Sequence, residues 1–60
     1  MDIIATQLEE GMEVMRLNGK YPVIIEGIVV QGLPKPYVEF YALNGQMFRV
    51  RNEEQFTVLS

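Results

Sequence analysis

The 60-residue sequence contains neither cysteine nor histidine. Without cysteine the chain has no disulfide bond and no thiolate ligand for a metal ion. Without histidine it lacks the side chain most often used as a general base and as a transition-metal ligand. We therefore expect a protein that is not an enzyme, with no catalytic residue, no metal site and no cofactor. The lack of cysteine also suits a reducing, cytoplasmic location.

Long apolar segments and basic residues are also scarce. The longest apolar stretch, from Val23 to Val30, is interrupted by Glu26 and Gly27 and falls short of the roughly 18 residues that span a membrane. No basic segment leads into an apolar one at the N-terminus, so we expect no signal peptide and no membrane partner. Five basic residues against eight acidic ones give a net charge of −3. Because nucleic acids bind to concentrated basic surfaces, a nucleic acid is a less expected partner than a protein.

The composition is that of a small globular domain. Hydrophobic residues make up 48% of the chain and charged residues 22%, which is too apolar for a disordered segment. Residues 1–60 are expected to form a single domain near the lower size limit for independent folding. Since such a domain buries only about 60% of its unfolded surface, it requires a dense core or an added oligomer interface.

The tripeptide Leu-Asn-Gly occurs twice, at residues 17–19 and 43–45, each time between apolar segments. Asn-Gly in this setting predicts a β-hairpin turn, because both residues tolerate positive φ. For the second hairpin, a two-residue loop would pair Tyr41 with Phe48 and mix charged side chains into both faces. A three-residue loop with Gly45 in the left-handed conformation separates the faces. We predict the three-residue loop, with these pairs: Phe40–Phe48 and Val38–Val50 on an apolar face, and Tyr37–Arg51, Glu39–Arg49 and Tyr41–Met47 on the other.

The first hairpin favours a shorter connection. A two-residue loop at Asn18-Gly19 places Val14 opposite Val23, and Met12 opposite Ile25, in two core pairs. A three-residue loop would place Glu13 opposite Val23 instead. We predict the two-residue loop, although Pro22 removes a backbone donor and implies an edge position or a distortion.

Two further elements are predicted before residue 32. Thr6 and Glu9 have the spacing of a capping box for a single helical turn, which Gly11 would end. Residues 20–31 are typical of one long strand, whose alternation falters at Gly27. A glycine at that position indicates a bulge or sharp bend that curls the sheet.

The remaining segments are short. Residues 32–36 contain two prolines and predict a loop. Residues 52–55 are too few for an α-helix and predict a short 3-10 turn before a last strand over residues 56–59. The acidic pairs Glu9-Glu10 and Glu53-Glu54 sit beside turns and are expected to be solvated surface. The expected core consists of Val14, Val23, Ile25, Val29, Val38, Phe40, Phe48, Val50, Phe56 and Val58.

These elements predict an all-β fold of about five strands, and at this level the chain resembles the Src-homology-three-like barrels, KOW-type domains included. The resemblance rests on Gly11 with Val14, on Gly19, on Gly27 with Val29, and on Asn-Glu-Glu-Gln before Phe-Thr-Val-Leu-Ser. It implies a strongly bent five-stranded barrel. The segments Arg-Leu-Asn-Gly and Gln-Met-Phe-Arg-Val also resemble the Sm-like proteins, whose topology is shared and whose function is RNA binding.

The charged face of the second hairpin is the candidate binding site. Its members surround Glu39 and combine aromatic, methionine and arginine side chains: Tyr37, Tyr41, Met47, Arg49 and Arg51. Such a set can form the centre of a protein interface, can stack bases and contact phosphates, or can simply cover a sheet face with cross-strand pairs. Residues 23–25 and 28–30 are apolar on both faces, so their strand is either covered on both sides or meets a partner chain.

The leading functional hypothesis is a non-enzymatic protein-interaction module, an accessory or regulatory factor of the size found among small phage and bacterial proteins. The first alternative is a barrel of Sm-like or KOW type that binds RNA or another single-stranded nucleic acid. The second is a structural homo-oligomer whose subunits pair through exposed strands.

Overall fold

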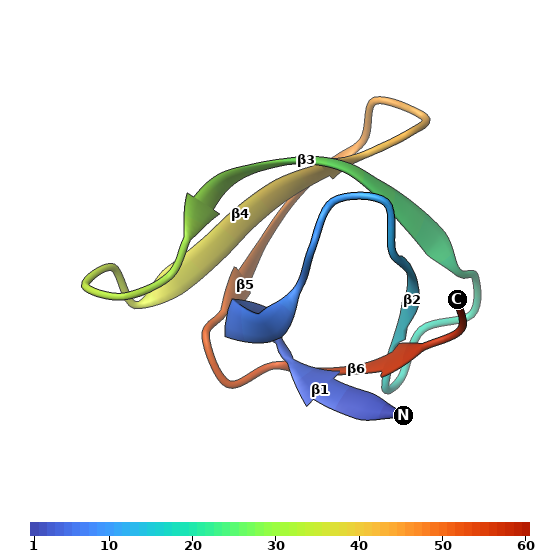
Figure 1. Cartoon of the computed structure of the whole chain (residues 1–60), viewed down its shortest axis with the longest axis horizontal. Coiled ribbons are helices and arrows are strands. Elements are labelled where there is room, and N and C mark those ends of the chain that lie inside the picture. Colours follow the sequence, from blue (N-terminus) through green and yellow to red (C-terminus); the bar gives the residue numbers. More distant parts are fainter.

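The computed structural model describes all 60 residues and places every strand in one antiparallel sheet that curls around a small core (Figure 1). The strands are β1 (Asp2–Ile4), β2 (Glu13–Arg16), β3 (Val23–Gln31), β4 (Tyr37–Ala42), β5 (Met47–Arg51) and β6 (Gln55–Val58), in the spatial order β1-β6-β2-β3-β4-β5. The one helical element is a 3-10 turn, η1 (Ala5–Gln7), and no helix is long and apolar enough to cross a membrane. The all-β prediction is confirmed.

The predicted closed barrel of five strands is wrong. The sheet has six strands, and no ladder joins its two edge strands, β1 and β5. The extra strand is β1, which pairs with β6 so that Ile3 lies opposite Phe56. Three residues are too few to show an alternating pattern, so this strand could not be predicted from residues 2–4 alone.

The β4–β5 hairpin forms as predicted. Phe40 lies opposite Phe48, Glu39 lies opposite Arg49, and the three other predicted pairs are present. Gly45 has a φ of +88°, and its N–H donates to the Ala42 carbonyl at 2.8 Å. The three-residue loop is therefore confirmed.

The first hairpin has the predicted register but a different loop. Val14 lies opposite Val23, and the Ile25 N–H donates to the Met12 carbonyl at 2.9 Å. The connection, however, spans residues 17–22, and φ is not positive at either residue of the expected two-residue loop. Pro22 offers no N–H to continue the ladder, and the end of β2 pairs with β6 on its other side.

Strand β3 arcs across the sheet and bends at the predicted glycine (Figure 1). It starts at Val23 rather than at residue 20, and its register against β4 shifts between Ile25 and Gly27. A second shift falls between Ile28 and Val30 and leaves Val29 54% exposed. The prediction of Val29 in the core is therefore wrong, because the second bulge breaks the alternation that the prediction assumed.

The N-terminal turn is present, but its predicted capping box is not. The turn covers Ala5–Gln7, and the Ile4 N–H donates to Oε1 of Gln7 at 3.0 Å. Gly11, with a φ of +93°, belongs to a separate turn that the Met12 N–H closes onto the Glu9 carbonyl at 3.2 Å.

The connection before the last strand is a single hydrogen-bonded turn. The Glu54 N–H donates to the Arg51 carbonyl at 3.0 Å, and Gln55 already belongs to β6. The predicted tight turn is therefore present, but as one isolated β-turn rather than a 3-10 element, because a single i→i+3 bond closes it. The predicted loop over residues 32–36 is present.

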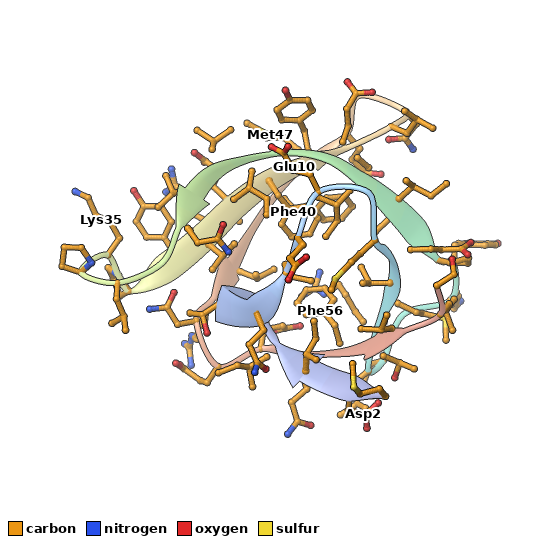
Figure 2. The ribbon with its side chains drawn as sticks, in the orientation of Figure 1. Asp2, Glu10, Lys35, Phe40, Met47 and Phe56 are labelled. Carbon is orange, nitrogen blue, oxygen red and sulfur yellow. The ribbon has the colours of Figure 1, made fainter.

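The core centres on Phe40, whose ring stacks on that of Phe48 with the ring centroids 5.1 Å apart. The ring of Phe56 meets Phe40 edge-on at a centroid distance of 6.1 Å, and both side chains lie inside the curled sheet (Figure 2). The buried cluster consists of Ile3, Ala5, Leu8, Val14, Ile25, Val38, Phe40, Val50 and Phe56. The predicted core residues Val23, Phe48 and Val58 are partly buried against it. Ile3, Ala5 and Leu8 of the buried cluster were not predicted from the sequence. They come from the N-terminal segment, which closes over the sheet.

Candidate functional site: the outer face of β4 and β5

The five predicted site residues lie together on the side of the β4–β5 hairpin that faces away from the core. Cross-strand pairing places Tyr37 beside Arg51 and Tyr41 beside Met47, with Glu39 and Arg49 between them. The alternate residues of both strands, among them Phe40 and Val50, point into the core. We call the six residues Tyr37, Glu39, Tyr41, Met47, Arg49 and Arg51 the outer face.

An ordered arginine occupies the centre of the outer face. Arg49 donates from Nε and Nη2 to Oε2 of Glu39 at 3.2 and 3.1 Å. Its guanidinium lies 4.6 Å from the centre of the Tyr37 ring. Exposed ion pairs and cation–π contacts each contribute only about 0.5–1 kcal/mol to stability. Together they favour, without fixing, a position of the guanidinium between Glu39 and Tyr37, since the arginine side chain carries about 2 kcal/mol of rotamer entropy.

Arg51 carries the uncompensated positive charge of this face. The structure contains two salt bridges, Arg49 with Glu39 and Arg16 with Glu54, and Arg51 takes part in neither. Its side chain is exposed. A ligand that approaches β5 therefore meets a free guanidinium at one end of the strand.

Tyr41 lies flat against the backbone of β3 at Gly27. A Cβ atom at Gly27 would fall 2.5 Å from the Tyr41 hydroxyl oxygen and 2.6 Å from its Cζ. The ring can lie there only because residue 27 has no side chain. Gly27 therefore supports the site by leaving room for the Tyr41 ring. From the sequence, Gly27 was assigned only to the bending of its strand, although a glycine in the middle of a strand also indicates close approach of another group.

Apolar side chains extend this surface beyond the hairpin. Ile24 and Val29 of β3 and Leu43 of the hairpin loop are exposed, as are Tyr41 and Met47. The sequence left two alternatives for the strand that is apolar on both faces: coverage on both sides by its own chain, or contact with a partner. In the structure, part of the second face of β3 is not covered by its own chain. Exposed aliphatic and aromatic groups gathered beside ordered charges are typical of a contact surface.

The acidic residues do not gather into a comparable site. No group of three or more aspartate or glutamate side chains lies close enough to hold a metal ion. Glu9, Glu10 and Glu53 are exposed, as expected for solvated surface. Glu54 differs, since it is only partly exposed and accepts a hydrogen bond from Arg16 Nε at 3.0 Å.

Comparison of the chain with protein-family models, with curated proteins and with solved structures finds no match. The resemblance to Src-homology-three-like and Sm-like barrels therefore stays a prediction from the residues.

Proposed function

We propose that this chain is a non-enzymatic protein-interaction module that binds another protein through the outer face of β4 and β5. The observation that carries the proposal is the composition of that face. Tyrosine, methionine and arginine are enriched at the centres of protein interfaces, and here they lie side by side, with Arg49 in contact with Glu39 and with the Tyr37 ring.

The size of the surface is consistent with this role. A standard interface covers about 800 Å² on each partner, which is about a fifth of the 4087 Å² accessible surface of the chain. Part of such an interface can be formed by the outer face together with the neighbouring exposed residues Ile24, Val29 and Leu43. An accessory or regulatory factor in the cytoplasm is the role that we assign to a module of this size.

The charge distribution favours a protein over a nucleic acid. Glu39 already neutralises Arg49, so Arg51 is the only unpaired cation on the outer face. Lys35 adds one further charge at the tip of the β3–β4 loop (Figure 2). Because affinity for nucleic acid rises with the number of phosphates that lysine and arginine neutralise, two free charges support only weak, salt-sensitive binding.

Photo-cross-linking followed by a binding measurement tests the proposal. A benzophenone amino acid at Met47, an exposed position on β5, is activated in extract of the source cell with and without prior nuclease treatment, and the cross-linked molecule is identified. The purified partner is then titrated against the unmodified chain and against Arg51→Glu. Lys35→Glu changes the net charge equally on the β3–β4 loop and serves as the matched control.

We expect Arg51→Glu to weaken partner binding about tenfold, which corresponds to roughly 1.4 kcal/mol, and Lys35→Glu to change it much less. Equal affinity of all three proteins for the partner would contradict the proposal. Cross-linking only to RNA or DNA, lost after nuclease treatment, would favour the nucleic-acid alternative. A homo-oligomer cross-linked through residue 47 would favour the structural one.

A further inference from the structure

Strand β5 presents free backbone hydrogen-bonding groups along the open edge of the sheet. At the two ends of the hairpin, the Ala42 N–H donates to the Gln46 carbonyl and the Asn52 N–H to the Pro36 carbonyl. In an antiparallel ladder, bonded positions alternate, so within β5 Phe48 and Val50 direct their backbone groups toward β4. The intervening residues direct theirs away from the sheet: Met47, Arg49 and Arg51. The Arg51 carbonyl alone has a partner already, because the Glu54 N–H donates to it at 3.0 Å.

The other edge of the sheet is closed by the chain itself. β1 has only three residues, and its last N–H, that of Ile4, is taken by the Gln7 side chain at 3.0 Å. The turn η1 follows directly after Ile4, and the Ala5 N–H donates to the Glu54 carbonyl at 2.9 Å. Of the two edge strands, β1 is short and partly capped, whereas β5 is longer and uncapped. An additional strand can therefore pair with β5.

Two hollows lie along β5, between its open edge and the connection that follows β2. The larger, about 590 Å³, is bounded by residues 16–19 on one side and by Arg51 and residues 53–55 on the other. The smaller, about 210 Å³, is bounded by residues 19–21 and by Phe48, with Phe40 and Phe56 also lining it. We call this stretch the seam. Its smaller hollow has an aromatic lining and its larger one is polar.

The basic residues of the chain concentrate at the seam. Four of the five line it or lie on β5: Arg16, Lys20, Arg49 and Arg51. Five of the eight acidic residues lie on other elements: Asp2, Glu9, Glu10, Glu13 and Glu26. The other three acidic residues lie at this edge: Glu54 pairs with Arg16, Glu39 pairs with Arg49, and Glu53 lines the larger hollow. Four cations against three carboxylates leave a local charge of +1 in a chain of net charge −3, so this edge favours an acidic ligand more than the rest of the surface does.

We propose that β5 binds an extended acidic segment of the partner protein, which adds to the sheet as an antiparallel strand and occupies the seam. This inference rests on the proposed function and names its mode of binding. A segment of five residues matches the length of β5. Its first and third residues lie opposite Arg51 and Arg49, and we expect both to be acidic. Its fourth residue lies opposite Phe48 and is expected to be apolar. The two kinds of residue are separated because alternate side chains of an added strand point to opposite faces of the sheet.

A second copy of the chain fits this edge less well than an acidic segment does. Symmetric pairing of two β5 strands about Arg49 places arginine opposite arginine, and pairing about Val50 places Arg49 opposite Arg51. Like charges directly opposite each other are destabilising. Pairing about Phe48 avoids the repulsion but leaves both Arg51 side chains outside the paired strands.

Backbone N-methylation of a synthetic peptide tests the proposal directly. The probe is a capped peptide containing Glu-Thr-Glu-Val-Thr, titrated into the isotope-labelled chain and followed by amide chemical shifts at millimolar concentrations. In the proposed geometry the second glutamate exchanges both backbone hydrogen bonds with Arg49, and the N–H of the first shares the Arg51 carbonyl with Glu54. The N–H groups of the threonine between them and of the valine point away from β5. N-methylation of both glutamates should abolish binding, and N-methylation of that threonine and the valine should change the Kd less than threefold.

Charge exchange tests the predicted register. Arg51→Glu should weaken the peptide about tenfold, and a peptide with lysine in place of the first glutamate should recover most of that loss on the variant. Lys35→Glu is the matched control and should change the Kd less than Arg51→Glu does, because Lys35 lies on the β3–β4 loop and has no predicted partner in the peptide. Arg51 forms no ion pair in the chain, so its replacement leaves the Arg49–Glu39 pair intact.

The outcomes separate this inference from the proposed function. Absence of binding by the parent peptide, or equal loss from both N-methylation patterns, would overturn strand addition. The proposed function would still stand if the cross-linked partner bound and Arg51→Glu weakened it. Conversely, peptide binding with the expected N-methylation pattern supports strand addition even if the photo-cross-linking identifies no protein. A dimer of the free chain held through β5 would overturn the choice of occupant.

Discussion

Replacement of Gly27 by alanine should destabilise the protein through one contact, the ring of Tyr41. A Cβ at residue 27 would lie 2.5 Å from the tyrosine hydroxyl oxygen and 2.8 Å from Cε1, so the ring has to move. Gly27 does not have a positive φ, and its backbone therefore accepts alanine without strain. The cost arises from displacement of the tyrosine alone.

The magnitude follows from two opposing effects. Overpacking of this kind costs about 1–3 kcal/mol, while loss of glycine freedom in the unfolded chain returns about 0.4–1 kcal/mol. We expect Gly27→Ala to lower the free energy of unfolding by about 1–2 kcal/mol, which corresponds to a fall in Tm of roughly 4–16 °C for a domain of this size. In a Tyr41→Ala background the same change should be neutral or stabilising, because the clash no longer exists.

Urea unfolding of four proteins measures this coupling: the parent chain, the two single variants and the double variant. Far-ultraviolet circular dichroism reports the transition without relying on tyrosine fluorescence, which Tyr41→Ala would alter. We expect an interaction energy of about 2 kcal/mol between the two positions. If Gly27→Ala costs the same in both backgrounds, Tyr41 does not lie on β3 as described.

Three further changes test other parts of the structure. Gly45→Ala should cost about 1 kcal/mol in urea unfolding, because a Cβ penalises the left-handed conformation; D-alanine at the same position, introduced by chemical synthesis, should cost nothing. An equal loss from both enantiomers would contradict the backbone explanation. Phe40→Ala should cost about 3–5 kcal/mol, a loss comparable with the whole stability of a 60-residue domain, and a folded circular dichroism spectrum with an unchanged Tm would show that its ring is not central to the core. Glu39→Gln should change the free energy of unfolding by less than about 1 kcal/mol, because the Arg49 side chain is 64% exposed; a larger loss would mean that the pair holds the hairpin together.

The β4–β5 hairpin was predictable because its two possible loops give very different faces. Only the three-residue loop gathers Phe40 and Phe48 on one face while pairing Glu39 with Arg49, and the structure has that register. The positions of the outer-face residues follow from the register, so the candidate site was largely predictable as well.

Other features depend on contacts between distant parts of the chain. The loop at residues 17–22 follows from the pairing of β2 with β6, which the local sequence does not encode. The bulge that exposes Val29 follows from the fit of β3 against β4. That β5 has a free edge depends on the order of the strands in the sheet. The hairpin pattern predicts that β5 pairs with β4, but it does not predict whether another strand pairs with the opposite side of β5.

The support of the outer face was predictable only in part. A glycine in the middle of a strand indicated a bend, and β3 bends there. That the ring of Tyr41 also covers Gly27 depends on the shifted register between β3 and β4. Sequence spacing alone does not determine that shift.

Hydrogen exchange of the five β5 amides, with and without the cross-linked partner, tests the central claim most directly. In the free chain the amides of Phe48 and Val50 should be protected, and those of Met47, Arg49 and Arg51 should exchange rapidly, since only the first two are bonded to β4. In the saturated complex all five should be protected. Rapid exchange of the three edge amides in the complex, or their protection already in the free chain, would contradict the account.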